Sequence, residues 1–347
     1  MKRYAILANP GHNRVYFEAS KALSRSELTL ALRHLGHESP EIKGEELGMV
    51  FYQTFTLPQP LSERELQILS ALSFSYAIFE LEEHEGACCL LPVTAPNPMY
   101  MDGSISSILK YSGKTNELFT RLMINLGLFS IKAEAEGIRI LDPVAGKGTT
   151  LFEALALGYD AYGIELYEKS VSESYTFLKK HLELAKFKHQ TSTEQINMQE
   201  KGLSAHRSTI ELAHNKAEMK SGAVRHWEMV CGNSMYADRY YKKNSFNLIV
   251  GDLPYGIQHG NVGAKTKGSA TRSPKELIAL CAEPWFKVLK SGGALVLSWN
   301  SFVCPRRQLS ELLESIGYLV KSEEIYESFE HRVDQAIKRD LLVAVKP

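Results

Sequence analysis

Residues 138–150 read IRILDPVAGKGTT, an apolar run followed by a turn with two glycines and then by residues that favour a helix. Gly146 and Gly148 let the backbone approach a ligand closely, because neither residue has a Cβ atom. The helix expected at Thr149 offers unpaired N–H groups at its N-terminus. This strand–turn–helix segment predicts an α/β fold with a ligand at the carboxyl end of the first strand.

The turn does not match two common nucleotide-binding patterns. The phosphate-loop pattern G-x-x-x-x-G-K-[ST] requires a glycine where Leu141 stands, and Gly148 follows Lys147. The pattern G-x-G-x-x-G lacks its third glycine, which Leu151 replaces. The turn alone therefore leaves the ligand open.

Glu165 narrows the choice of ligand. It stands 23 residues after Asp142, at the end of the next predicted strand. An acid in this place can accept both hydroxyls of a ribose, which points to an adenosine-containing cofactor. The alternative is a glutamate at a strand end that is merely exposed to solvent.

Strand and helix patterns alternate beyond residue 105, which favours a mostly parallel sheet with helices on both faces. The predicted strands are 137–141, 159–164, 227–231, 246–251 and 293–299, and the predicted helices are 115–129, 148–157, 168–187 and 275–289. Residues 316–326 and 339–346 predict an antiparallel hairpin that closes the sheet. The expected fold class is α/β with a Rossmann-like sheet.

Residues 1–100 predict a separate small α+β domain with the element order of a ferredoxin-like fold, and this domain is a candidate accessory for RNA binding. The expected strands are 4–8, 48–57, 76–82 and 87–93, and the expected helices are 24–35, capped by Ser24, and 63–72, opened by Ser62. The proline-rich stretch LPVTAPNPMYMDGS places the domain boundary near 95–105, so the second domain spans 105–347. Segment 186–226 predicts a helical insertion that either contacts a polynucleotide or is simply solvated, and its mixed charge favours the second.

Composition limits the possible partners. Forty Lys+Arg balance forty Asp+Glu, so the chain lacks the bulk positive field of many nucleic-acid-binding proteins and would need a local basic patch. The five scattered cysteines have no C-x-x-C pair and no zinc spacing, which predicts reduced thiols and no metal. No apolar run is long enough for a signal peptide or a membrane span of ~18–20 residues, which predicts a cytoplasmic protein without a membrane partner.

The fourth strand of the large domain runs into Asp252-Leu253-Pro254-Tyr255-Gly256. An exocyclic amine on a base is a poor nucleophile, because its lone pair is delocalised into the ring. The Asp252 carboxylate and the Leu253 carbonyl can each accept one amine hydrogen and so draw the nitrogen towards tetrahedral geometry. Pro254 keeps Leu253 out of the helical region, Tyr255 offers a flat face for the base, and Gly256 lets the loop turn beneath it.

With these motifs in this order, residues 105–347 outside the insertion resemble the amino-methyltransferases that use S-adenosylmethionine and carry [DNS]-[PL]-P-[YFW] after the fourth strand. They resemble in particular the RNA-methylase domain of the tRNA guanine-N2 methyltransferases usually linked to THUMP domains. Leu253 departs from the commoner Asp-Pro-Pro-Tyr, but that position supplies only a carbonyl. The resemblance implies S-adenosylmethionine as cofactor and RNA, specifically tRNA, as substrate.

The segment 110–128 resembles the cofactor-contacting helix of that family, and Asn233, with Ser234 second, follows the third strand where the family holds the adenine amine. The expected cofactor-binding residues are Thr115, Asn116, Asp142, Pro143, Ala145, Gly146, Gly148, Thr149, Glu165, Asn233 and Ser234. Thr115, Asn116 and Asn233 would also serve as ordinary caps or turn residues.

The substrate side is expected in the loop HGNVGAKTKGSATR, which contains basic residues and no acid. The residues expected to contact RNA are Gly256, His259, Lys265, Lys267 and Arg272. A loop without function would look similar. His331 and Arg332, in the closing hairpin, are interpreted as structural.

Three other functions remain open. A DNA adenine-N6 methyltransferase uses the same acceptor geometry, although no large target-recognition region is visible. Methylation of a glutamine amide typically uses Asn in place of Asp252, which argues mildly against it. A catalytically silent RNA-binding module is opposed by the presence of both Asp252 and Tyr255.

Overall fold

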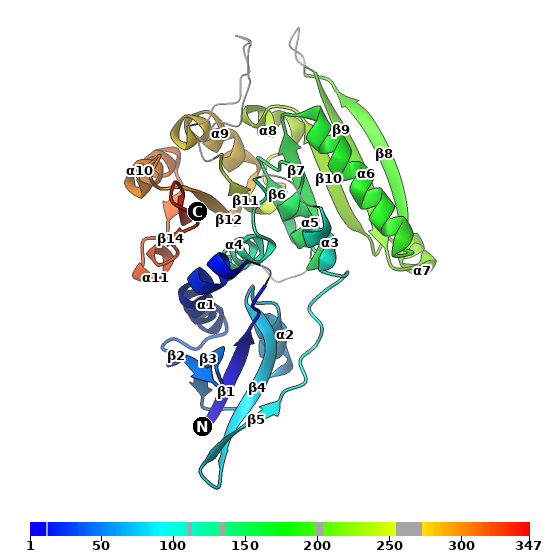
Figure 1. The fold of residues 1–347 in the computed structure, drawn as a ribbon. Coiled ribbons are helices and arrows are strands. Elements are labelled where there is room, and N and C mark those ends of the chain that lie inside the picture. Colours follow the sequence, from blue (N-terminus) through cyan, green and yellow to red (C-terminus); the bar gives the residue numbers. More distant parts are fainter. Residues whose placement is uncertain (12, 110–112, 132–136, 199–203, 255–272) are drawn as a thin grey trace.

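The protein is described by a computed structural model that covers residues 1–11, 13–109, 113–131, 137–198, 204–254 and 273–347. Two sheets organise the chain, a small one near the N-terminus and a large one that holds the rest of the strands (Figure 1). The described chain has no helix or strand between Pro92 and Ser104. No helix within these ranges is long and apolar enough to cross a membrane.

The small sheet is antiparallel, with the strand order β2-β3-β1-β4-β5. Its strands are β1 (Lys2–Ala8), β2 (Ile42–Leu47), β3 (Val50–Leu57), β4 (Ser75–His84) and β5 (Ala87–Pro92), and its helices are α1 (Arg14–His34) and α2 (Glu63–Ser70). Without the edge strand β5, this is the β-α-β-β-α-β unit of a ferredoxin-like fold. The prediction of a small α+β domain is confirmed, although β2 was not predicted.

Helix α1 begins ten residues earlier than predicted. Its N-cap is Asn13, whose side chain accepts a hydrogen bond from the Tyr16 amide. Ser24, the predicted cap, lies buried inside the helix, where its hydroxyl donates to the Lys21 carbonyl and accepts from the Gln53 side chain. A serine can bond back to the preceding turn, so a Ser within a helical pattern does not by itself mark a helix start. The predicted cap of α2, Ser62, is confirmed.

The large sheet has the strand order β13-β15-β12-β11-β6-β7-β10-β9-β8, and β14 pairs with β15. The parallel strands are β6 (Arg139–Asp142), β7 (Asp160–Glu165), β10 (Arg225–Cys231), β11 (Phe246–Asp252) and β12 (Leu289–Asn300). The antiparallel strands are β8 (Lys188–Ile196), β9 (Ala205–Ala213), β13 (Leu319–Val320), β14 (His331–Arg332) and β15 (Lys338–Val345). The predicted α/β class with a mostly parallel centre and an antiparallel closing strand is confirmed.

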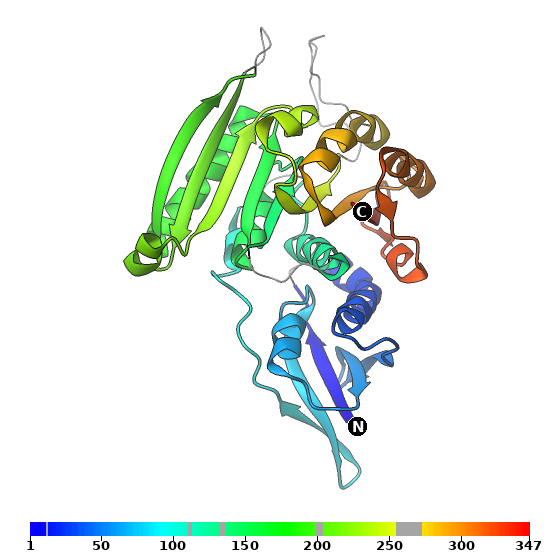
Figure 2. The same ribbon diagram turned by 180° about the vertical axis from the view of Figure 1, so that it is seen from behind.

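Helices cover both faces of this sheet (Figure 2). The longer ones are α4 (Glu117–Ser130), α5 (Thr149–Ala156), α6 (Glu168–Leu184), α9 (Pro274–Val288) and α10 (Arg306–Ile316), and the shorter ones are α3 (Ser104–Ile108), α7 (Lys216–Ser221), α8 (Ala237–Tyr240) and α11 (Glu324–Glu327). The large sheet has a hydrophobic core cluster on each face. Along β11, Leu248 and Val250 belong to one of these clusters and Ile249 belongs to the other. Burial on both faces explains the continuous apolar run of this strand.

Two predictions about secondary structure are wrong. Segment 186–226 is not a helical insertion, because β8 and β9 form an antiparallel hairpin that extends the sheet beyond β10. In β9, the buried residues Ser208, Ile210 and Leu212 alternate with more exposed ones, which is the period of a strand. The predicted strand 316–326 shrinks to β13, because the exposed polar residues 322–324 turn the chain into α11.

The N-terminal domain packs on the large one through α1 and α4. Leu23 and Leu30 of α1 belong to the same core cluster as Leu122 of α4. The fully buried Glu27 accepts a hydrogen bond of 2.7 Å from the Asn125 side chain of α4, and burial raises the pKa of this carboxyl. The contact brings the first residues of α1 close to the first residues of α4.

Candidate active site

The glycine turn joins β6 to α5 in a conformation that requires glycine at two positions. The φ angles are +54° at Gly146 and +87° at Gly148, which is the N-cap of α5. A Cβ atom on Gly148 would lie 2.9 Å from the Ser174 hydroxyl, whereas one on Gly146 would meet nothing within 4 Å. Open space therefore adjoins Gly146, beside the backbone of the turn.

Glu165, at the end of β7, is bound directly to this turn. Its two carboxylate oxygens accept one backbone N–H each, from Gly146 at 2.9 Å and from Tyr167 at 2.8 Å. Burial raises the pKa of Glu165, while these hydrogen bonds favour the ionised form. Each oxygen retains capacity for a further donor, as an acceptor of ribose hydroxyls must.

Asp142, at the end of β6, is only 4% exposed. It accepts a hydrogen bond of 3.0 Å from the Val144 amide and another from the Thr150 side chain. Burial raises the pKa of Asp142 to about 7, and the charges of Asp252 and Glu165 add to this effect. Three carboxyl groups thus gather at the ends of the neighbouring strands β11, β6 and β7, an arrangement that favours a ligand with positive charge.

Asp252, the last residue of β11, is held from three sides. The hydroxyls of Thr115 and Ser298 donate to its two carboxylate oxygens, one each. A guanidinium nitrogen of Arg339 lies 3.8 Å from one of these oxygens, and the next backbone amide, Leu253 N–H, donates to the Ser298 carbonyl at 2.8 Å. These contacts fix the direction of the carboxylate and leave it able to accept further hydrogen bonds.

The sequence analysis did not identify Ser298 and Arg339. Ser298 is opposite Asp252 in the parallel register of β11 and β12, and both residues stand at the carboxyl ends of their strands. Arg339 is the second residue of the antiparallel strand β15, and its guanidinium lies 4.5 Å from the centre of the Phe119 ring. The predicted adjacency of strand ends could have indicated Ser298, whereas Arg339 required the register of β15.

The other predicted cofactor residues fall into two groups. Pro143, Ala145 and Thr149 lie buried or nearly so in the turn itself. Asn116 is the N-cap of α4, where it accepts from the Leu118 and Phe119 amides at 2.9 and 3.2 Å. Thr115 instead contacts Asp252, which joins this helix start to the fourth-strand motif.

Asn233 and Ser234 follow β10 and open a 3-10 turn. The Asn233 side chain accepts a hydrogen bond of 3.1 Å from the Met235 amide. The buried Ser234 hydroxyl accepts from the Trp285 indole at 3.0 Å, so it contributes to packing against α9. Asn233 therefore remains the better candidate of the two for contact with an adenine.

Pro254 is the last described residue of the fourth-strand motif, and it is exposed, whereas the Leu253 side chain is buried. The remaining predicted residues of the motif and of the basic loop lie outside the described residues: Tyr255, Gly256, His259, Lys265, Lys267 and Arg272. Within the described ranges, no three His, Cys, Asp or Glu side chains cluster as metal ligands do.

Comparison with known proteins gives one family. Residues 123–271 match the model of the family described as RMKL-like, methyltransferase domain. None of the curated proteins matches this chain.

Solved structures also resemble the chain. A TehB-like S-adenosylmethionine-dependent methyltransferase from Corynebacterium glutamicum is 14% identical, with a TM-score of 0.35 over 62% of this chain and 83% of that one. An rRNA methylase from Streptococcus thermophilus is 10% identical, with a TM-score of 0.32 over 61% of this chain and 87% of that one.

The match over residues 123–271 supports a class I methyltransferase domain in that part of the chain, and S-adenosylmethionine is the cofactor. The described residues suit this cofactor. Its sulfonium and ammonium groups are cations, and the carboxyl groups of Asp142, Glu165 and Asp252 meet at one edge of the sheet.

Proposed function

We propose that this protein is an RNA methyltransferase that transfers a methyl group from S-adenosylmethionine to an exocyclic base amine, guanine N2 in tRNA. The observation that carries the proposal is the Asp252 carboxylate, which Thr115, Ser298 and Arg339 hold at the end of β11. A fixed acceptor in this place suits an amine, which must be oriented rather than strongly deprotonated.

The cofactor would lie across the turn between β6 and α5. Glu165 would accept the two ribose hydroxyls, since both of its oxygens are already oriented by backbone amides. Asp142 would face the positive end of the cofactor, and Asn233 would bind the adenine. The open space beside Gly146 leaves room for a ligand against the backbone.

S-adenosylmethionine supplies a methyl group on a sulfonium, which is a good leaving group. The Asp252 carboxylate and the Leu253 carbonyl would each accept one hydrogen of the target amine, so that the nitrogen lone pair turns out of the base plane. The nitrogen would gain the methyl group as the sulfonium becomes a neutral thioether, and the proton that the nitrogen loses would pass to the Asp252 carboxylate and then to solvent. Ser298 and Thr115 would act as positioning residues, because they hold Asp252 rather than the substrate.

The test incubates the purified full chain with S-adenosylmethionine and either unmodified tRNA or double-stranded DNA, followed by mass spectrometry of the nucleosides. We expect N2-methylguanosine in tRNA, and we expect Asp252→Ala to form it ~100-fold or more slowly. Asp238→Ala is a matched control, because this carboxylate sits on α8 and pairs with Lys287 at 3.2 Å. N6-methyladenine in DNA would favour the DNA methyltransferase instead, and transfer to neither substrate would refute the proposal.

A further inference from the structure

A cavity of about 100 Å³ lies where the N-terminal domain meets the large domain. Its walls come from the first residues of α1, the residues around the start of α4, and the segment from β14 to β15. Figure 1 shows these three elements close together. The volume is that of about three water molecules, which suits a single small group rather than a whole nucleoside.

The described residues that line this cavity include three cations and no carboxylate. The cations are Lys114, Arg332 and Arg339. Two acids lie next to them, since Glu117 is 3.6 Å from Lys114 and Asp252 is 3.8 Å from Arg339. The three cations outnumber the two acids by one positive charge, which matches the single negative charge of one phosphodiester.

Two helix N-termini also face the cavity. Asn13 and Asn116, the N-caps of α1 and α4, both line it, and these helices are 21 and 14 residues long. The N-terminus of a helix carries partial positive charge and favours anions. The first turn of α1 contains no acidic residue that would cancel this charge.

His331 forms a neutral part of the wall. Its Nδ1 donates to the Phe329 carbonyl at 3.0 Å, and its ring contacts the rings of Tyr16 and Phe119. Burial lowers the pKa of His331 to about 4, so the ring is uncharged at neutral pH. The residue is 9% exposed, and its buried Nε2 has no hydrogen-bond partner among the described residues, which favours a polar ligand at this wall.

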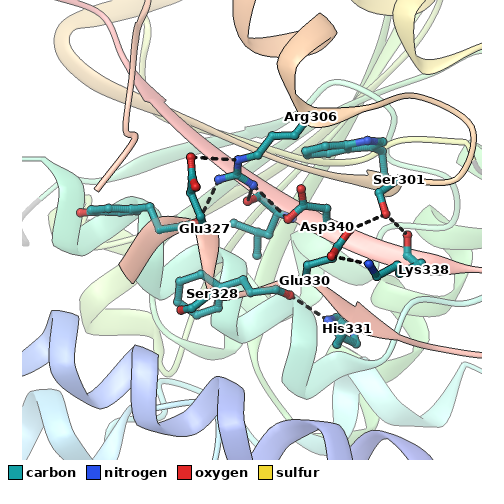
Figure 3. Close-up of polar contacts among 12 residues, drawn as sticks. Ser301, Arg306, Glu327, Ser328, Glu330, His331, Lys338 and Asp340 are labelled. Carbon is teal, nitrogen blue, oxygen red and sulfur yellow. Dashed lines mark hydrogen bonds and ion pairs between the residues drawn. The ribbon is translucent and has the colours of Figure 1, made fainter. Parts of the chain in front are cut away.

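Ion pairs hold this wall in place (Figure 3). Arg306 of α10 donates to Asp340 at 2.9 Å, and Lys338 pairs with Glu330 at 2.5 Å, next to His331. The segment from β14 to β15 is therefore fixed on both sides before any ligand binds. A site of this kind loses little conformational entropy when it binds an anion.

We propose that this cavity binds one backbone phosphate of the RNA substrate, next to the nucleotide whose base reaches Asp252. Arg339 connects the two sites, since it lines the cavity and lies beside Asp252. Asn116 lines the cavity, and its neighbour Thr115 donates to the same carboxylate. A phosphate held at this place would set the position of the backbone while the base enters the active site. The inference rests on the proposed RNA methyltransferase activity.

The test measures RNA affinity for the full chain with bound cofactor over a range of salt concentrations. Arg332→Gln is the main variant, because this exposed side chain lines the cavity. We expect it to weaken RNA binding about tenfold and to reduce the salt dependence by about one counterion. Arg307→Gln is the matched control, since this arginine is exposed on α10 and pairs with Glu311. The control should bind RNA as the unaltered protein does.

A second arm replaces single phosphates around the target nucleotide with uncharged methylphosphonates. One replacement should weaken binding to the unaltered protein about tenfold and have little further effect on Arg332→Gln. Inorganic phosphate, compared with chloride at equal ionic strength, should compete with RNA for the unaltered protein but less for the variant.

The phosphate site would be overturned if every methylphosphonate weakened RNA binding equally in both proteins. It would also be overturned if Arg332→Gln left the salt dependence of RNA binding unchanged. Either result would leave the proposed RNA methylation standing. If the protein binds inorganic phosphate through Arg332 but methylates no RNA, the proposed function fails. The backbone assignment then fails with it, in favour of a free phosphate-bearing ligand.

Discussion

Cofactor binding should release a proton from Asp142. Burial and two neighbouring carboxylates raise the pKa of this group to about 7 in the absence of cofactor. A cationic ligand stabilises the ionised form, so binding should lower the pKa back towards its ordinary value. Affinity for S-adenosylmethionine should therefore rise with pH and level off above pH 7.

The size of the effect follows from the pKa of about 7. At pH 6, about nine-tenths of Asp142 is protonated, so the apparent affinity should be about tenfold below its value at pH 7.5 and above. Close to one proton should leave per cofactor bound at pH 6, and only about a quarter of a proton at pH 7.5. Measurements should not go above pH 7.5, because the α-amino group of the cofactor itself titrates near 8.

Calorimetry in two buffers of different ionisation enthalpy measures both the affinity for the cofactor and the number of protons released on binding. Asp142→Asn should bind more weakly and lose the pH dependence. Glu165→Gln should also bind more weakly but keep the proton release, with the midpoint at lower pH, because one of the charges that raises the pKa of Asp142 is gone. Binding without proton release at pH 6, or the same pH dependence in Asp142→Asn, would refute the electrostatic reasoning.

Three further predictions concern the same strand ends. Asp252→Ala should lower the single-turnover rate of methyl transfer ~100-fold or more with cofactor affinity retained, and Ser298→Ala should lower it by less. A rate in Asp252→Ala equal to that of the unaltered protein would exclude Asp252 as the acceptor. Glu165→Ala should weaken cofactor binding by about 1–3 kcal/mol in calorimetry, and unchanged affinity would remove Glu165 from the site. In denaturant unfolding without cofactor, Asp142→Asn should stabilise the protein at pH 8 by up to about 4 kcal/mol and have little effect near pH 4. The raised pKa of Asp142 makes the wild-type protein lose stability as pH rises from about 4 through about 7. A variant with the same free energy of unfolding as the wild type at both pH 4 and pH 8 would contradict this.

The sequence predicted those parts of the site that depend on local chemistry. The glycines of the turn and Glu165 follow from the conformation and position that a β-α turn requires, and the structure brings them into contact. The support of Asp252 was not predictable in the same way. Ser298 and Arg339 come from strands 46 and 87 residues further along the chain, and their approach depends on strand order and register.

The errors in secondary structure have a similar cause. Segment 186–226 as a whole contains many charged residues of both signs, and the alternation of buried and exposed residues that marks a strand is clear only in β9. Charge content alone suggested a solvated helix, but pairing with β10 decided the outcome. Tertiary contacts of this kind override local propensity.

The buried contact between α1 and α4 makes the two sheets interdependent. Glu27 is fully buried and accepts hydrogen bonds from Asn125 of one domain and from Ser73 of the other. Separating the domains would leave the Asn125 side-chain amide without its partners Glu27 and Ala71, would remove one hydrogen bond from the buried Glu27 carboxyl, and would expose the apolar surface around Leu23 and Leu30. The chain should therefore melt in one cooperative transition, and a fragment lacking the first hundred residues should be prone to aggregation.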